Sequence, residues 1–188
     1  MKKLLFFVSA ILFSINAWSQ VNMVTLSGGY SFANLEDTDV GLSGWRINGL
    51  YEAGTFSGKV LQGLSVGYIS VSGSATVEED GIMKNAEYKL GTVPIYYAPK
   101  LLLGNSDKFK GFVKLAIGGQ FSSINRTGTA VILEADDFGF YGGGGAGFMY
   151  FLKSNIFLNM EYEWAWLSNT YYRDGGMNTA SAGIGMKF

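Results

Sequence analysis

The sequence predicts an all-β protein, an eight-stranded antiparallel up-and-down transmembrane β-barrel. Two observations carry this prediction: the composition, and a regular alternation of apolar and polar residues along most of the chain. Among 188 residues there are 27 Gly, only 2 Pro and 15% aromatic residues, which suits closely packed strands better than helices. The length fits one domain.

The N-terminal segment differs from the rest and is typical of a secretory signal peptide. Lys2 and Lys3 supply a positive start, an apolar run occupies residues 4–15, and Ala17 and Ser19 place small residues before the cleavage point. The alternative is a transmembrane anchor, but the run is shorter than the ~20 residues that a helical span needs. We therefore expect a signal peptide at 1–19, export through the inner membrane, and a barrel domain at 20–188.

From about residue 21 onward the dominant period is two. In a β-strand this period sends successive side chains to opposite faces of the sheet. The clearest segment has an apolar face from Ile156 to Trp166 and a polar face with Asn159, Glu161 and Glu163. Segments of about ten residues with such faces are typical of membrane-spanning strands. The eight segments fall at about residues 24–32, 45–53, 60–68, 92–103, 113–121, 138–151, 156–166 and 179–188.

The connections between these segments alternate in length. Short connections lie at 54–58, 104–109 and 152–155, and long ones at 34–43, 72–89, 122–137 and 168–177. Short turns on one rim and long loops on the other are typical of bacterial outer-membrane barrels. The long connections hold the acidic residues Glu36, Asp37, Asp39, Glu78, Glu79, Asp80, Glu87, Glu134, Asp136, Asp137 and Asp174. We expect these loops to be solvated, or to attract divalent cations or a basic partner.

Two places leave the strand pattern open. Residues Thr76-Val77 and Glu87-Tyr88 could extend the third and fourth strands above the membrane, so ten strands remain a minor alternative. Pro99 interrupts the fourth segment, and a closed barrel has no free edge to absorb a missing donor. We expect a β-bulge near Pro99. The glycine cluster at 142–145 lies inside a strand and is interpreted as structural, because a phosphate-binding loop would open a helix.

Alternation alone does not separate a membrane barrel from a soluble one, but three features favour the membrane. The chain ends on Phe188, aromatic residues gather at strand ends, and whole charges lie in the middle of the polar faces. Lipid rejects charged groups, so these must face the lumen, where buried charge has to be paired. We expect a lumen network that links Arg46, Lys100 and Lys114 with Glu52, Glu161 and Glu163. Such a network is a structural plug or, as the alternative, a gate.

With these features the chain resembles the small bacterial outer-membrane β-barrel family, of the OmpX and OmpA-membrane-domain kind. The resemblance covers about Val21 to Phe188 and rests on the signal peptide, the eight segments, the fifth strand from Phe112 to Gly118, the Gly-rich sixth strand and the terminal Phe188. It implies insertion by the outer-membrane assembly machinery with periplasmic chaperones, and Phe188 as the assembly signal. It also implies outer-membrane lipids and lipopolysaccharide as neighbours.

The residue content limits the possible functions. His and Cys are absent, which excludes Ser-His, Cys-His and His-metal chemistry, and we expect no enzyme, cofactor or metal site. The net charge of −1 gives no case for nucleic acid. We expect a monomeric, non-catalytic outer-membrane protein with an envelope-structural or surface-binding role through acidic loops. The alternative is a narrow pore gated by the charged lumen; an enzyme using Glu161 and Glu163 is less favoured.

Overall fold

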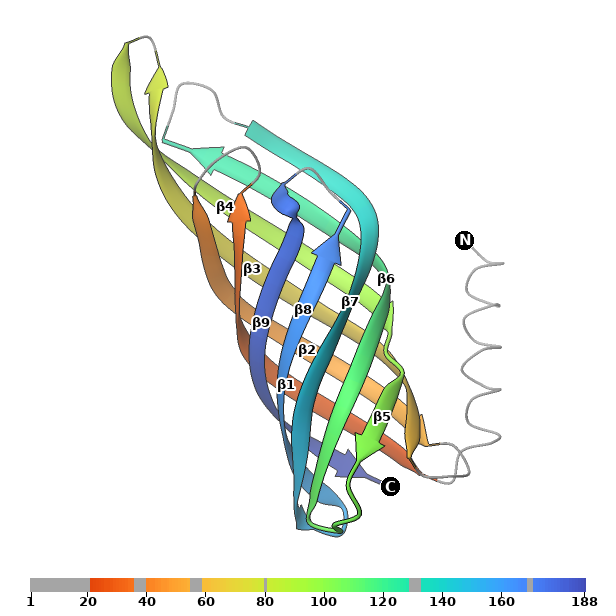
Figure 1. Ribbon diagram of the computed structural model, residues 1–188. Coiled ribbons are helices and arrows are strands. Elements are labelled where there is room, and N and C mark those ends of the chain that lie inside the picture. Colours follow the sequence, from red (N-terminus) through yellow and green to blue (C-terminus); the bar gives the residue numbers. More distant parts are fainter. Residues whose placement is uncertain (1–20, 36–39, 55–58, 80, 129–132, 169–170) are drawn as a thin grey trace, which may run out of the picture.

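The computed structural model is a closed antiparallel β-barrel (Figure 1), and it describes residues 21–35, 40–54, 59–79, 81–128, 133–168 and 171–188. The ring closes because β1 pairs with both β2 and β9. The strands within this part of the chain are β1 (Asn22–Leu35), β2 (Gly41–Gly54), β3 (Val60–Glu79), β4 (Ile82–Tyr97), β5 (Lys100–Leu103), β6 (Phe109–Thr127), β7 (Leu133–Lys153), β8 (Ile156–Leu167) and β9 (Tyr172–Lys187).

Strands β4 and β5 are two halves of one wall strand, because both lie between β3 and β6. The described residues therefore form eight wall strands, which confirms the predicted eight-stranded barrel. The ten-stranded alternative is wrong. Among the residues described, no helix is both long and apolar enough to cross a membrane. The expected signal peptide at 1–19 lies outside the described residues.

Pro99 breaks the strand assignment without inserting a residue. Tyr97 pairs with Leu64, and Lys100 pairs with Leu61, so both strands advance by the same number of residues across the break. The Pro99 carbonyl oxygen accepts a hydrogen bond from the Leu115 N–H at 3.0 Å. Only the donor that proline lacks is lost from the ladder. The predicted bulge at Pro99 is therefore wrong.

The long connections are mostly strand rather than loop. Strands β3 and β4 stay paired up to Glu79 and Ile82, and β6 and β7 stay paired up to Arg126 and Leu133. The predicted loops at 72–89 and 122–137 are therefore wrong, whereas the predicted extension of the third and fourth strands through Thr76-Val77 and Glu87-Tyr88 is confirmed. In these extensions the alternation is reversed, because apolar side chains such as Leu90 are buried inside and polar ones such as Lys89 face outward. The wall is consequently tallest along β3, β4, β6 and β7, at the top of Figure 1.

The two faces of the wall follow the alternation in the sequence. On β6, Phe112 and Ala116 are buried in the interior, whereas Leu115 is 57% exposed on the outside. Large apolar side chains are exposed in this way on the outer face of every wall strand. A water-soluble monomer rarely exposes so continuous an apolar surface. The outer face therefore suits contact with hydrocarbon.

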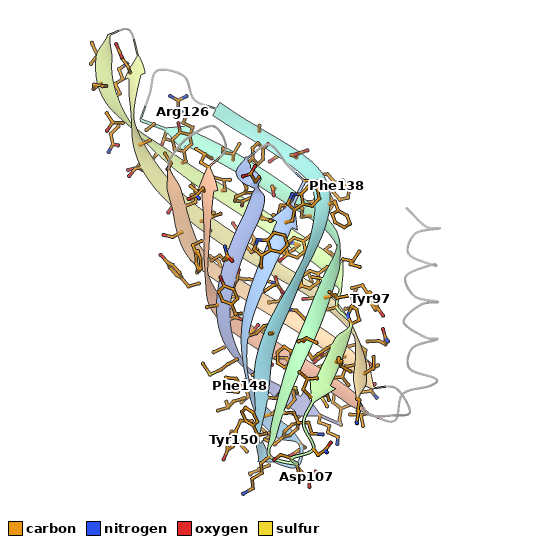
Figure 2. The ribbon with its side chains drawn as sticks, in the orientation of Figure 1. Tyr97, Asp107, Arg126, Phe138, Phe148 and Tyr150 are labelled. Atoms are coloured by element: carbon orange, nitrogen blue, oxygen red, sulfur yellow. The ribbon has the colours of Figure 1, made fainter. Side chains whose placement is uncertain are left out.

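Aromatic rings gather near both rims of the outer face. We call the rim at which β3, β4, β6 and β7 extend the loop end, and the opposite rim the turn end. Towards the loop end the ring centroids of Trp45 and Tyr68 lie 5.4 Å apart, and those of Phe121 and Phe138 lie 4.8 Å apart. Phe148, stacked with the ring of Phe109, lies near the turn end together with Tyr150 (Figure 2). Two aromatic girdles with an apolar band between them are the outer surface of a transmembrane barrel.

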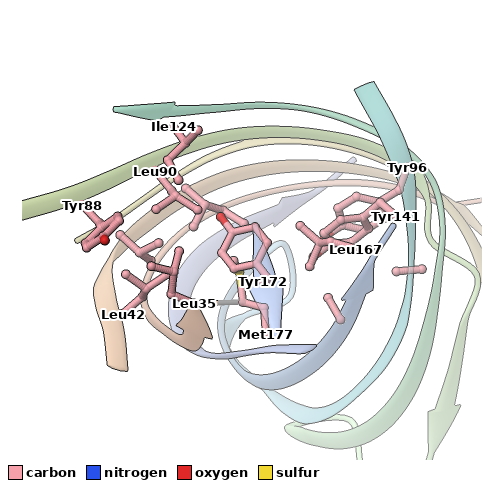
Figure 3. Close-up of a cluster of buried hydrophobic side chains, with 14 of the residues drawn as sticks. Leu35, Leu42, Tyr88, Leu90, Tyr96, Ile124, Tyr141, Leu167, Tyr172 and Met177 are labelled. Carbon is pink, nitrogen blue, oxygen red and sulfur yellow. The ribbon is translucent and has the colours of Figure 1, made fainter. Parts of the chain in front are cut away.

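The interior contains an apolar cluster at each end. The turn-end cluster consists of Met23, Leu61, Leu102, Phe112, Met149 and Phe157. The loop-end cluster includes Leu35, Leu42, Leu90, Ile124, Tyr172 and Met177 (Figure 3). Inward glycines make room for the large rings: a Cβ on Gly147 would lie 2.7 Å from Phe112, and one on Gly185 would lie 2.1 Å from Phe157.

Candidate functional site

The six charged residues predicted for the lumen lie inside the barrel. Arg46, Glu52, Lys100, Lys114 and Glu163 are at most 5% exposed, and the side chain of Glu161 is 8% exposed. Each of these side chains lies on the inward face of its strand. The outward face of the same strand carries exposed apolar residues. Their charges are opposed in pairs, as burial of ions in a narrow lumen requires.

Four of the six form a central charge cluster around Glu163. The Arg46 Nη1 atom lies 2.6 Å from Glu163 Oε1, and the Lys114 Nζ atom lies 2.6 Å from Glu163 Oε2. Lys114 also forms an ion pair with Glu161. Strands β2, β6 and β8 supply these groups, so the cluster ties opposite sides of the wall together.

Two tyrosines complete this cluster. The Tyr141 hydroxyl donates to Glu163 at 2.5 Å, and the Tyr96 hydroxyl accepts from Arg46 at 2.7 Å. Their rings are stacked with centroids 5.0 Å apart. Neither tyrosine was predicted from the sequence as part of the lumen network. The alternation could have found both, because Tyr96 shares a face with Lys100 and Tyr141 shares a face with the inward glycines.

Lys100 and Glu52 form a separate pair closer to the turns. The Lys100 Nζ atom lies 2.7 Å from Glu52 Oε1, and neither oxygen of Glu52 accepts a hydrogen bond from the described residues. The same ammonium group lies 4.4 Å from the centroid of the Phe112 ring. Lys100 and Lys114 are direct cross-strand partners, so each like charge turns to a different carboxylate. The expected single network is thus two groups.

The geometry limits the chemistry of the lumen. Glu161 and Glu163 are both ion-paired, and the apolar clusters separate them from either end of the barrel. A cavity beside Arg46 and Asn159 has a volume of about 10 Å³, enough for one water molecule. Within the described ranges, no three His, Cys, Asp or Glu side chains are placed to hold a metal ion.

Phe188 lies on the outer face at the turn end. Its N–H donates to the Asn22 carbonyl oxygen at 2.9 Å, and the Asn22 N–H donates to the Phe188 carbonyl oxygen at 3.1 Å. The ring is 62% exposed, and its role as an assembly signal stays a prediction.

The loop-end rim carries charges of both signs. Exposed carboxylates of Glu78, Glu87 and Asp136 lie on the strand extensions. Lys89 and Arg126 lie among them, and the guanidinium of Arg126 stands 5.8 Å from the centroid of the Tyr88 ring. The described part of this rim is therefore mixed in charge. Glu36, Asp37, Asp39 and Asp80 lie outside the described residues.

No family model and no curated protein sequence matches this chain. Solved structures do match its architecture. Ail, the attachment invasion locus protein of Yersinia pestis, aligns with a TM-score of 0.51 at 16% identity, over 89% of this chain and 99% of Ail. Neisserial surface protein A aligns with a TM-score of 0.58 at 12% identity, over 89% and 97%. The chain has the fold of a small outer-membrane β-barrel.

Outer membrane protein OprG from Pseudomonas aeruginosa shares this fold, with a TM-score of 0.54 at 12% identity over 91% of this chain and 97% of OprG. The resemblance expected from the sequence is thereby confirmed at the level of architecture. At such low identity the likeness carries the outer-membrane barrel fold and no individual activity.

Proposed function

We propose that this protein is an integral outer-membrane protein, exported by its N-terminal segment, with a non-catalytic role at the cell surface. One observation carries the proposal. An apolar outer face encircles the wall, and at the loop end alone four strands, β3, β4, β6 and β7, extend beyond the aromatic girdle. The apolar face suits the bilayer, and the strand extensions present polar side chains on a rigid support.

The interior supports a structural role for the charged residues. Breaking a buried ion pair leaves an uncompensated charge, which is strongly unfavourable in a narrow lumen. Opening a path would also require both apolar clusters to move. These features argue against the alternative of a gated narrow pore, and they support a rigid plug that holds the wall strands in register.

The strand extensions supply the surface for binding. The β3–β4 hairpin carries Ser72, Ser74 and Glu87 on its outward face, next to Asn125 and Thr127 of β6. These groups can form hydrogen bonds, and Lys89 of the same surface adds a positive charge beside Glu87, which suits adhesion or contact with neighbouring envelope components. The name of Ail, an attachment protein, supports the same role for this architecture.

The surroundings follow from the location. The outer face would contact outer-membrane lipids and lipopolysaccharide, and assembly would use the outer-membrane machinery with periplasmic chaperones. Closure of the sheet removes the free edges that promote pairing between barrels, so the protein would act as a monomer.

A hairpin truncation tests the surface role. Among the described residues, positions 75–79 of β3 pair with positions 82–86 of β4, so replacing residues 75–86 with Asn-Gly keeps the closing pair of Ser74 and Glu87. We expect the truncated protein to reach the outer membrane with an unchanged heat-modifiable band, but to lose surface attachment or envelope protection measured against a deletion strain. Attachment and detergent sensitivity equal to wild type in both the truncated and the deletion strain would overturn the proposal.

A further inference from the structure

A hollow on the outer face combines aromatic walls with amide and carboxylate groups. It has a volume of about 610 Å³ and lies where β1, β2, β8 and β9 approach the loop end, side by side in Figure 1. Its walls include Phe32 and Trp164, which are 41% and 51% exposed. Its polar groups come from Asn34, Ser43, Asp174 and Asn178.

The sheet register explains how the aromatic and polar groups come together. Asn178 of β9 pairs with Trp164 on one side and with Phe32 on the other, and Phe32 pairs in turn with Ser43. An amide therefore lies between two aromatic rings on one face. The Tyr162 hydroxyl donates to Asn178 Oδ1 at 2.8 Å, which orients the amide and leaves its N–H groups to donate elsewhere.

A distortion of β9 places the carboxylate at this hollow. Between the pairs Ala33–Met177 and Leu35–Tyr172, β1 advances two residues while β9 advances five. The extra residues include Asp174 and Gly175, with φ values of 51° and 67°. A left-handed conformation is unusual for a residue other than glycine, and irregularities of this kind often redirect a side chain beside a functional site. Here the redirected side chain is Asp174.

The lining chemistry selects one class of ligand. A sugar ring has an apolar C–H face that packs on aromatic rings and hydroxyl groups that bond to amides and carboxylates. None of the described lining residues is basic, so a phosphate or sulfate group meets no counter-charge from the part of the hollow that the structure describes. An uncharged saccharide fits this combination.

The position selects the source of the saccharide. Tyr30 and Tyr162 lie on the outer face two residues further from the loop end than Phe32 and Trp164. Both tyrosines are at least 50% exposed and belong to the aromatic girdle at the loop end. A ligand in the hollow would therefore lie at the depth of lipid headgroups. We infer that this hollow binds a neutral sugar of a glycolipid headgroup in the outer leaflet, an inference that rests on the proposed outer-membrane location.

Titration of the protein in phospholipid nanodiscs with lipopolysaccharide carrying a complete core oligosaccharide tests the inference. The readout is the NMR shift of the Trp164 indole, with Trp45, which is 50% exposed and outside the hollow, as the internal reference. We expect Trp164 to shift and Trp45 to stay. Asn178→Ala should weaken the apparent affinity about tenfold, whereas Asn125→Ala, an exposed amide on β6, should change it less than about twofold.

Equal shifts of both indoles, or an unchanged affinity in Asn178→Ala, would overturn the inference in favour of unspecific lipid contact. An equal Trp164 shift with the deacylated core oligosaccharide would overturn the lipid-linked source. Ser43→Ala provides a second variant if Asn178→Ala does not give a compact unheated band. Outer-membrane recovery of the protein is measured separately, so loss of the proposed function and loss of this site are distinguishable.

Discussion

The Lys114 Nζ atom of β6 and the Glu163 Oε2 atom of β8 form an ion pair at 2.6 Å inside the barrel. The strand β7 lies between β6 and β8, so the pair reaches across it. The residue between them in the register is Gly145, which pairs with Lys114 on one side and with Glu163 on the other. A side chain at Gly145 would occupy the space between the two charges. The glycine-rich β7 thus allows a charge pair to span three strands.

Glu163 should be the most sensitive member of the central charge cluster. It interacts with Arg46, Lys114, Tyr96 and Tyr141, whereas Glu161 pairs with Lys114 alone among the described contacts. We expect Glu163→Gln to lower the free energy of unfolding by about 3 kcal/mol, because Arg46 loses its carboxylate. Urea unfolding in lipid vesicles measures this, with Glu161→Gln as the milder control. An equal or larger loss in the control would contradict the cluster's geometry.

The inward glycines should tolerate no methyl group. A Cβ on Gly147 would lie 2.1 Å from the Met160 carbonyl oxygen, whereas one on the outward Gly49 would have no neighbour closer than 3.9 Å. We expect Gly147→Ala to reduce the unfolding free energy by about 1–3 kcal/mol and Gly49→Ala to change it by less than about 0.5 kcal/mol. Similar values for the two variants, measured by the same unfolding assay, would argue against the close packing.

A charged side chain introduced on the outer face should lower the free energy of unfolding only where that face lies in the apolar band. Leu115 and Ser123 lie on the same face of β6, in the apolar band and beyond the outer girdle respectively. We expect Leu115→Arg to destabilise the protein in lipid vesicles by about 2–4 kcal/mol, and Ser123→Arg by about 0–1 kcal/mol. Comparable small effects at both positions would indicate that the outer face meets water.

The purified protein should not conduct ions. The turn-end and loop-end clusters close both ends of the lumen, and the charged groups between them are paired. We expect flat current traces in planar bilayers, with a known porin as positive control. Reproducible single-channel steps would favour the pore alternative.

Phe188 should affect assembly more than stability. Its backbone pairs with Asn22 do not depend on the ring, which is 62% exposed. We expect Phe188→Ala to lower the amount of folded protein in the outer membrane while the unfolding free energy changes by less than about 1 kcal/mol. Phe109→Ala, 50% exposed in the same girdle, is the control. Equal yields of the two variants would remove the proposed assembly signal.

Much of the fold could be predicted because lipid imposes a strict two-residue rule. The rule predicts Val113, Leu115 and Ile117 on the outer face and Lys114 on the inner face, as the structure has them. It failed in the strand extensions, because water contacts the outer face there and the alternation is reversed, with apolar Leu90 inside and polar Lys89 outside. It also failed at Pro99, since the sequence does not show that neighbouring hydrogen bonds hold the register around one missing donor.

The partners within the lumen could not be predicted. The carboxylate that pairs with Lys100 is determined by how far each strand is shifted along its neighbour when the barrel closes. The local sequence pattern does not contain this shift. The apolar clusters were missed for a related reason. Phe157 is an apolar residue on the inward face of its strand and Leu90 lies outside the predicted segments, and only closure of the ring brings each of them together with the other members of its cluster.

Cell fractionation combined with heat-modifiable gel mobility is the most direct test of whether the barrel is inserted in the outer membrane. We expect the protein in the outer-membrane fraction, with a compact band that migrates faster before heating than after. A soluble periplasmic protein with a single heat-insensitive band would contradict it, and would leave the exposed apolar face without an explanation.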